Sequence, residues 1–294
     1  MKDFGKRVRC AIDRTLEAAR TPSPTGRSIR RGRAFIAMSL LALALVAAAG
    51  AETAVPPVVV IAHRGEHLHH PENTLSAFRA AIEIGADYVE LDVRTTSDGR
   101  LVLMHDSTVD ARTDGHGEVS KLTFAQIRAL DAGGRMGTEF AGTRVPTFEE
   151  ALDLARGKIG VYVDCKNLSP GDLVAALRKA GMEKQAVIYG GAAFLGQVRA
   201  LEPALRVMPE ADKPEVLGRL IETLQLKIAA FGARDFDDAT VAVARNAKID
   251  IYVDRLGNED TPAFWQDAIE RGATGIQTDH PAELLAFLRS KSKH

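Results

Sequence analysis

Acidic, imidazole and guanidinium side chains gather in short stretches that end or follow runs of apolar and β-branched residues. The stretches are Ala62-His63-Arg64-Gly65, Glu90-Leu91-Asp92, Met104-His105-Asp106 and Asp164-Cys165-Lys166. Imidazole titrates near neutral pH and can exchange protons with a substrate. Carboxylates that are buried together repel one another and require a compensating cation. The stretches therefore predict a site that combines a bound cation with acid–base chemistry.

Strand alternation predicts which of these side chains share a face. Glu90 and Asp92 are two residues apart, and so are Asp164 and Lys166, so that the members of each pair point to the same side of their strand. A barrel interior would then collect the three carboxylates near one rim. Oxygen ligands suit Mg²⁺, Ca²⁺ or Mn²⁺ better than zinc.

A tight hairpin is expected within residues 88–105. The dipeptide Asp98-Gly99 is a strong signal for a two-residue turn, and a four-residue connection is too short for a parallel crossover. With these two residues at the centre of the turn, Asp92 lies directly opposite His105, and Glu90 lies diagonally from it.

The elements that would position these groups form a repeating pattern. Nine β-rich runs between residues 58 and 278 alternate, for the most part, with amphipathic helical patterns, which predicts an α/β fold with a parallel sheet. We expect a (β/α)8 TIM-type barrel, in which the antiparallel hairpin accounts for the ninth run and residues 107–145 form a loop insertion. A doubly wound sheet is the alternative, but the first strand lacks the Gly-rich phosphate loop.

The N-terminal region differs in charge from the remainder of the 294-residue chain. Residues 1–33 carry ten Lys and Arg against three Asp and Glu, and residues 34–51 carry no charge. This pattern predicts a signal peptide in residues 1–51, or a membrane anchor if the segment is kept, ahead of a catalytic domain in residues 52–294. We therefore expect an exported protein, periplasmic or secreted, whose membrane contact is limited to this segment.

Charge also excludes a class of partner. Residues 52–294 hold 28 of the 38 Lys and Arg and 36 of the 39 Asp and Glu, a net charge of −8. Such a domain lacks the basic surface that nucleic acid requires. The pattern leaves the oligomeric state open.

The order and spacing of several motifs resemble the glycerophosphodiester phosphodiesterase family across residues 58–289. The motifs are His63-Arg64-Gly65, Pro71-Glu72-Asn73-Thr74, Gly85-Ala86-Asp87, Glu90-Leu91-Asp92-Val93, Asp98-Gly99, His105-Asp106 and Thr278-Asp279-x-Pro281. The resemblance implies a metal-dependent barrel enzyme that hydrolyses glycerophosphodiesters to glycerol 3-phosphate and an alcohol.

The same resemblance implies roles for individual residues. His63 and His105 would be the general acid and base, with their order left open. The implied ligands of a Ca²⁺ or Mg²⁺ ion are Glu90, Asp92 and Asp164, the last at a position where the family usually has Glu. The implied phosphate contacts are Arg64 and Lys166, with Glu72 beside the metal site.

Other interpretations use the same residues. A phospholipase-type phosphodiesterase acting on intact lipids would need an exposed apolar cluster in residues 107–145, where the sequence has only scattered candidates. A secreted binding barrel without activity is a further alternative, against which the presence of both histidines and of the Glu90–Asp92 pair argues.

Overall fold

The computed structural model describes residues 58–291, in which strands and helices alternate along the chain. The strands are β1 (Val59–Ala62), β2 (Tyr88–Thr95), β3 (Leu101–Leu103), β4 (Gly160–Cys165), β5 (Ala186–Tyr189), β6 (Arg206–Met208), β7 (Ile228–Phe231), β8 (Asp250–Arg255) and β9 (Gly275–Thr278). The helices are α2 (Leu75–Ile84), α3 (Phe124–Ala129), α4 (Phe148–Ala155), α5 (Pro170–Ala180), α6 (Ala192–Leu201), α7 (Pro214–Leu224), α8 (Asp238–Ala247), α9 (Pro262–Arg271) and α10 (Pro281–Lys291).

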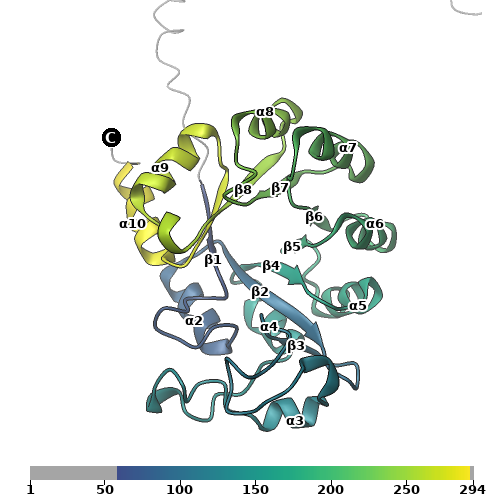
Figure 1. Cartoon of the computed structure of the whole chain (residues 1–294), viewed down its shortest axis with the longest axis vertical. Coiled ribbons are helices and arrows are strands. Elements are labelled where there is room, and N and C mark those ends of the chain that lie inside the picture. The colour runs from purple at the N-terminus through teal and green to yellow at the C-terminus, as the bar shows by residue number, and fades with distance from the viewer. Residues whose placement is uncertain (1–57, 292–294) are drawn as a thin grey trace, which may run out of the picture. The chain divides into compact units, whose positions relative to one another are not determined.

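The strands form a nearly closed barrel, which confirms the expected fold. Eight strands follow the order β6-β5-β4-β2-β1-β9-β8-β7, and every pairing along this path is parallel. The ring is completed between β6 and β7 by a bridge from Glu210 to Ala230. Figure 1 shows the helices around this ring of strands, with α3 apart from them in the insertion.

Two apolar layers hold the barrel together. The larger lies between strands and helices and includes Leu91, Val163, Phe148 and Trp265, each almost completely buried. The smaller fills the interior of the barrel with residues of opposite strand parity. Its buried members are Ile61, Tyr162, Val187, Met208, Ile228, Ala230 and Tyr252.

The hairpin of β2 and β3 is antiparallel and lies off the barrel path, as expected, but its register differs from the prediction. Val93 pairs with Leu103, and the Met104 amide donates to the Asp92 carbonyl oxygen at 3.0 Å, so that Asp92 lies opposite Met104 rather than His105. The turn contains three residues between Thr96 and Arg100. It is closed by a hydrogen bond of 2.9 Å, which the Thr96 amide donates to the Arg100 carbonyl oxygen. Gly99 at φ 79° supplies the left-handed position of this wider turn.

The expected insertion covers residues 107–145 and has more order than its sequence indicated. It contains α3, which begins at a capping box formed by Thr123 and Gln126, and a small apolar core that includes Val109, Val119 and Ile127. The sequence pattern missed this helix because it is only six residues long.

The predicted signal or anchor segment in residues 1–51 lies outside the described residues. Among the helices of residues 58–291, none has the length and apolar character needed to cross a membrane.

Candidate active site

The inward side chains at the carboxyl ends of the strands form one ring at the mouth of the barrel. Alternation continues the inner apolar layer outward, from Ile61 on β1 to His63 just after it, and from Tyr162 to Asp164 on β4. The ring consists of His63, Asp92, Asp164, Tyr189, Glu210, Asp254 and Asp279. Polar side chains therefore replace apolar ones at the end of the barrel where this fold performs its chemistry.

The three predicted metal ligands lie together. One oxygen each from Glu90, Asp92 and Asp164 falls within 4.8 Å of the others, and Glu90 and Asp92 are 3% and 1% exposed. Burial raises the pKa of Glu90 well above its usual value, and the charges of Asp92 and Asp164 raise it further. Burial also raises the pKa of Asp164. A group of buried carboxylates with this mutual repulsion fits a divalent cation.

Lys166 supplies positive charge to this group. Its Nζ lies 3.0 Å from Asp92 Oδ1 and 2.6 Å from Asp164 Oδ2. Burial opposes the charge of the lysine, but the two carboxylates outweigh it and raise the pKa of Lys166. The ammonium group thus marks the place where the carboxylates attract a cation, and it lies within reach of an anion bound there.

Arg64 connects the first strand to the same carboxylates. Its backbone amide donates to Glu90 Oε2 at 2.9 Å, and its Nε lies 3.5 Å from Asp92 Oδ2. The guanidinium also donates to Glu72 Oε1 at 3.1 Å, and Glu72 accepts a further contact of 3.2 Å from Arg112 Nε. Glu72 therefore contacts two arginines and positions the Arg64 side chain.

Asn73 holds Asp92 in place, a role that the sequence did not reveal. The Asn73 side chain donates to Asp92 Oδ2 at 2.7 Å and accepts from the Asp92 amide at 3.0 Å. Asn73 is 4% exposed and has a left-handed backbone at φ 55°, which asparagine tolerates better than most residues. The only available signal was its position in the Pro71-Glu72-Asn73-Thr74 motif.

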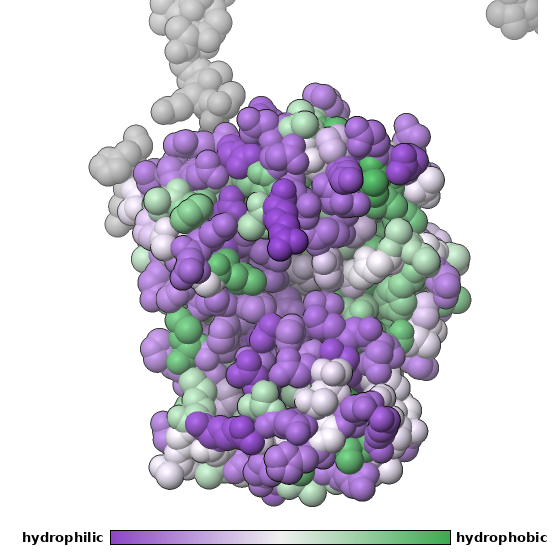
Figure 2. Space-filling view, viewed as in Figure 1, coloured by the Kyte–Doolittle hydropathy of each residue, from purple (hydrophilic) through white to green (hydrophobic). Residues whose placement is uncertain are grey.

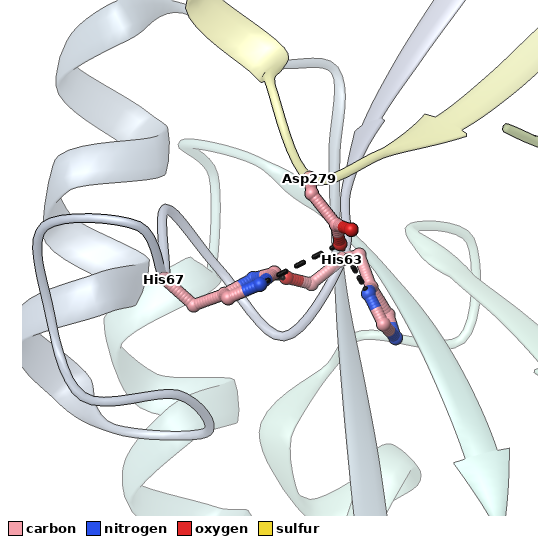
Figure 3. Close-up of side chains that lie close together, drawn as sticks. All are labelled: His63, His67 and Asp279. Atoms are coloured by element: carbon pink, nitrogen blue, oxygen red, sulfur yellow. Dashed lines mark hydrogen bonds and ion pairs between the residues drawn. The ribbon is translucent and has the colours of Figure 1, made fainter. Parts of the chain in front are cut away.

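His63 is oriented by an aspartate that directly follows the last strand, β9 (Figure 3). Its Nδ1 lies 2.7 Å from Asp279 Oδ1, and His67 Nε2 lies 3.5 Å from the same oxygen. Although burial raises the pKa of Asp279, the hydrogen bond and charge of His63 outweigh it, so that the net effect lowers the pKa. An ionised Asp279 accepts the proton of Nδ1, which leaves His63 Nε2 available to a substrate.

A buried carboxylate supports Asp279 in turn. Asp260 accepts hydrogen bonds from Trp265 Nε1 at 2.7 Å, from Thr278 Oγ1 at 2.7 Å and from the Asp279 amide at 2.5 Å. Thr278 and Asp279 belong to the Thr-Asp-x-Pro motif, for which the sequence alone gave no role. The structure assigns this motif to the support of His63.

His105 lies at the edge of the site, just beyond β3. Its carbonyl oxygen accepts from Arg94 Nη2 at 2.7 Å, and its Nδ1 lies 2.8 Å from Asp106 Oδ1. The hydrogen bond from His105 lowers the pKa of Asp106. A cavity of about 320 Å³ between the barrel and the insertion is lined by His105 together with His67, Glu72 and Arg112. The insertion thus provides one wall of the space beside His105.

A second group that could hold a metal ion is the cluster of His63, His67 and Asp279. Its mixed nitrogen and oxygen donors differ from the oxygen donors of Glu90, Asp92 and Asp164, and suit transition metals better than Mg²⁺ or Ca²⁺. In this structure the Asp279 carboxylate already accepts from His63 and from the Gly257 amide at 3.3 Å. The carboxylate group is therefore the better candidate for a hard divalent cation.

Comparison with other sequences gives a family. The model of the glycerophosphoryl diester phosphodiesterase family matches residues 63–283. A glycerophosphodiester phosphodiesterase of Caldanaerobacter subterraneus is 41% identical over 157 residues, which cover 51% of this chain and 65% of that protein. One from Bacillus subtilis is 28% identical over 249 residues, covering 76% of this chain and 84% of its own length. The chain spans 46% of the mouse glycerophosphodiester phosphodiesterase 1.

Solved structures share the barrel. A glycerophosphodiester phosphodiesterase from Agrobacterium tumefaciens is 29% identical, with a TM-score of 0.71 over 78% of this chain and 99% of that one. An Oleispira antarctica phosphodiesterase, solved with sn-glycerol-3-phosphate, is 23% identical, with a TM-score of 0.73 over 80% and 97%. The second similarity supports the fold alone. With the family model extending over nearly all of the barrel, the chain belongs to the glycerophosphoryl diester phosphodiesterase family.

Proposed function

We propose that this protein hydrolyses glycerophosphodiesters to glycerol 3-phosphate and an alcohol. The observation that carries the proposal is the group formed by Glu90, Asp92 and Asp164 at the same barrel mouth as a histidine oriented by Asp279. The family match supports the substrate class. The active protein, on this proposal, is a phosphoric diester hydrolase.

The carboxylates would hold a divalent cation, for which Ca²⁺ and Mg²⁺ are the candidates because all three donors are oxygen. When bound, such an ion neutralises charge on the phosphate oxygens of the substrate. Arg64 and Lys166 would add hydrogen bonds to the same oxygens. Glu72 and Asn73 contribute by holding Arg64 and Asp92 in position.

His63 and His105 would transfer the protons. Each carries its Nδ1 against a carboxylate, at 2.7 Å for Asp279 and 2.8 Å for Asp106, which directs Nε2 away from that carboxylate. One imidazole would accept the proton of the attacking hydroxyl or water, and the other would protonate the departing alkoxide. General acid–base catalysis of this kind contributes about 10²–10⁴-fold to the rate.

Soluble diesters are favoured over intact lipids. Activity on a membrane requires an exposed apolar cluster. Among the described residues, the exposed large apolar side chains near the insertion are Leu68 and Met136, 40% and 39% exposed. Hydrophilic side chains dominate the face drawn in Figure 2.

Export directed by the N-terminal segment is also part of this proposal. The mass of the protein isolated from its own cells tests whether that segment has been removed.

Hydrolysis of glycerophosphocholine with and without EDTA tests the proposal. We expect release of glycerol 3-phosphate that stops on chelation, returns with Mg²⁺ or Ca²⁺, and falls at least 100-fold in His63→Ala and His105→Ala. His116→Ala is the matched control, because His116 lies in the insertion with 81% of its side chain exposed. Activity that survives EDTA and both substitutions would refute the mechanism.

A further inference from the structure

The half of the barrel mouth opposite the metal ligands carries a second polar cluster that the proposed mechanism does not use. Tyr189 ends β5, Glu210 follows β6, and Asp254 lies near the end of β8. Tyr189 donates its hydroxyl to Glu210 Oε2 at 2.5 Å. These side chains are partly exposed, so a substrate at the mouth can reach them.

The two carboxylates of this cluster lack a cationic partner. Among residues 58–291, neither Glu210 nor Asp254 forms an ion pair. Burial raises the pKa of Asp254 to about 7, with the charges of Glu210 and Asp164 adding to the effect. Burial likewise raises the pKa of Glu210. The cluster is therefore an electronegative site that a positive group would stabilise.

A buried acceptor beside the cluster points to a ligand with hydrogen-bond donors. Gln277 lies in register with Asp254 on the neighbouring strand and is only 6% exposed. Its Oε1 is buried and accepts no hydrogen bond from the described residues. An amide oxygen buried in this way costs free energy unless a donor reaches it. A ligand that carries N–H groups would satisfy it.

A metal ion fits this cluster less well than an organic cation. A metal site needs several ligand atoms close together. Among the described residues, neither Glu210 nor Asp254 belongs to a group of three potential ligands whose donor atoms lie within 4.8 Å of one another. An organic cation whose donors point in different directions can bind acceptors that do not form such a group. A protonated primary amine has three such donors.

We propose that Glu210, Asp254 and Gln277, with Tyr189 as a neighbouring wall, form an ammonium subsite that binds a primary amine on the leaving alcohol of the substrate. The proposal deepens the proposed function and rests on it. Tyr189 pairs in register with Asp164, so the subsite begins one strand away from the metal ligands. Glu210, which accepts the Tyr189 hydroxyl, follows β6, the next strand along the barrel.

The test compares kcat/KM for two diesters of similar size under saturating metal. Glycerophosphoethanolamine carries the amine, and glycerophosphoglycerol replaces it with neutral hydroxyls. We expect the wild-type protein to favour the ethanolamine ester by about tenfold, and Glu210→Gln and Asp254→Asn each to reduce this ratio several-fold. Glycerophosphocholine, whose nitrogen has no N–H, should rank between the two.

The matched control is Glu222→Gln on α7, an exposed glutamate that should leave the ratio of the two substrates as in the wild type. Equal kcat/KM values for both diesters in the wild type would overturn the ammonium subsite, and so would a ratio unchanged in Glu210→Gln and Asp254→Asn. Preference for the choline ester over the ethanolamine ester would refute the primary amine. If neither diester is hydrolysed, the proposed function itself fails. If both are hydrolysed equally well, only the ammonium subsite fails, so the two outcomes can be distinguished.

Discussion

Replacing Asp279 with asparagine removes the charge that orients His63 while nearly preserving its shape. In the structure both oxygens of Asp279 are acceptors, Oδ1 for His63 Nδ1 at 2.7 Å and Oδ2 for the Gly257 amide at 3.3 Å. An amide has one oxygen and one NH₂ group, so one of these donors must then face another donor. If the oxygen stays with Gly257, the NH₂ group meets His63 and favours the tautomer with its proton on Nε2.

The expected size of the effect follows from the role of His63. A histidine in the wrong tautomer loses its contribution as an acid or base, which is about 10²–10⁴-fold in rate. This corresponds to about 3–5 kcal/mol in the activation free energy, at 1.36 kcal/mol for each factor of ten. Because Asp279→Asn leaves the proposed metal ligands and Arg64 in place, we expect the loss in kcat rather than in KM.

Steady-state hydrolysis of glycerophosphodiesters and ¹⁵N NMR of the histidine rings together test this reasoning. In the wild type we expect the His63 Nδ1 resonance of a protonated nitrogen, and in Asp279→Asn a shift of the proton to Nε2. Asp238→Asn is the control, since the Asp238 side chain is 95% exposed. A kcat for Asp279→Asn within threefold of the wild type, or an unchanged tautomer, would refute the orienting role of Asp279.

Three further predictions concern stability. The pKa of Asp254 is about 7 in the folded state and about 3.9 in the unfolded state, so folding disfavours the ionised form. The stability of the protein therefore falls as pH rises from about 4 to 7. Asp254→Asn should raise Tm at pH 8 and not at pH 4. Asp260→Ala leaves three buried donors without an acceptor and should lower the free energy of unfolding by about 2–4 kcal/mol, as measured by urea titration. A loss below about 0.5 kcal/mol would contradict the role of the Asp260 hydrogen bonds. Gly65→Ala should lower the free energy of unfolding by about 2–4 kcal/mol. Gly65 has φ 87°, and a Cβ there would lie 2.7 Å from the nearest side-chain atom of α2. A variant that unfolds at the wild-type Tm would contradict this prediction.

The sequence predicted the barrel and the grouping of its carboxylates because both depend on local periodicity. Alternating strands and helices predict parallel pairing, and the two-residue spacing of Glu90 and Asp92 is sufficient to put both on the inner face. The same parity argument placed Asp164, which pairs with Asp92 in the observed register. The family match supports the proposed substrate class but changes none of these placements.

Contacts between residues that are distant in the sequence could not be predicted from local patterns. The opposition of Asp92 and His105 was wrong because the turn contains one residue more than the Asp98-Gly99 signal indicates, and a shift of one residue exchanges the faces of a strand. Pairing between Asp279 and His63 joins the last and first strands of the barrel, a contact that no local pattern encodes. The support of Asp92 by Asn73 likewise depends on a left-handed loop that composition does not reveal.

The proposed mechanism depends most on where a cation binds. Crystals of the protein grown with Mn²⁺ and glycerol 3-phosphate, measured above the manganese absorption edge, would locate the metal by its anomalous signal. We predict a single strong peak among the oxygens of Glu90, Asp92 and Asp164, with the phosphate between it and His63. A peak between His63, His67 and Asp279, or no peak at a concentration that supports hydrolysis, would contradict the proposed centre.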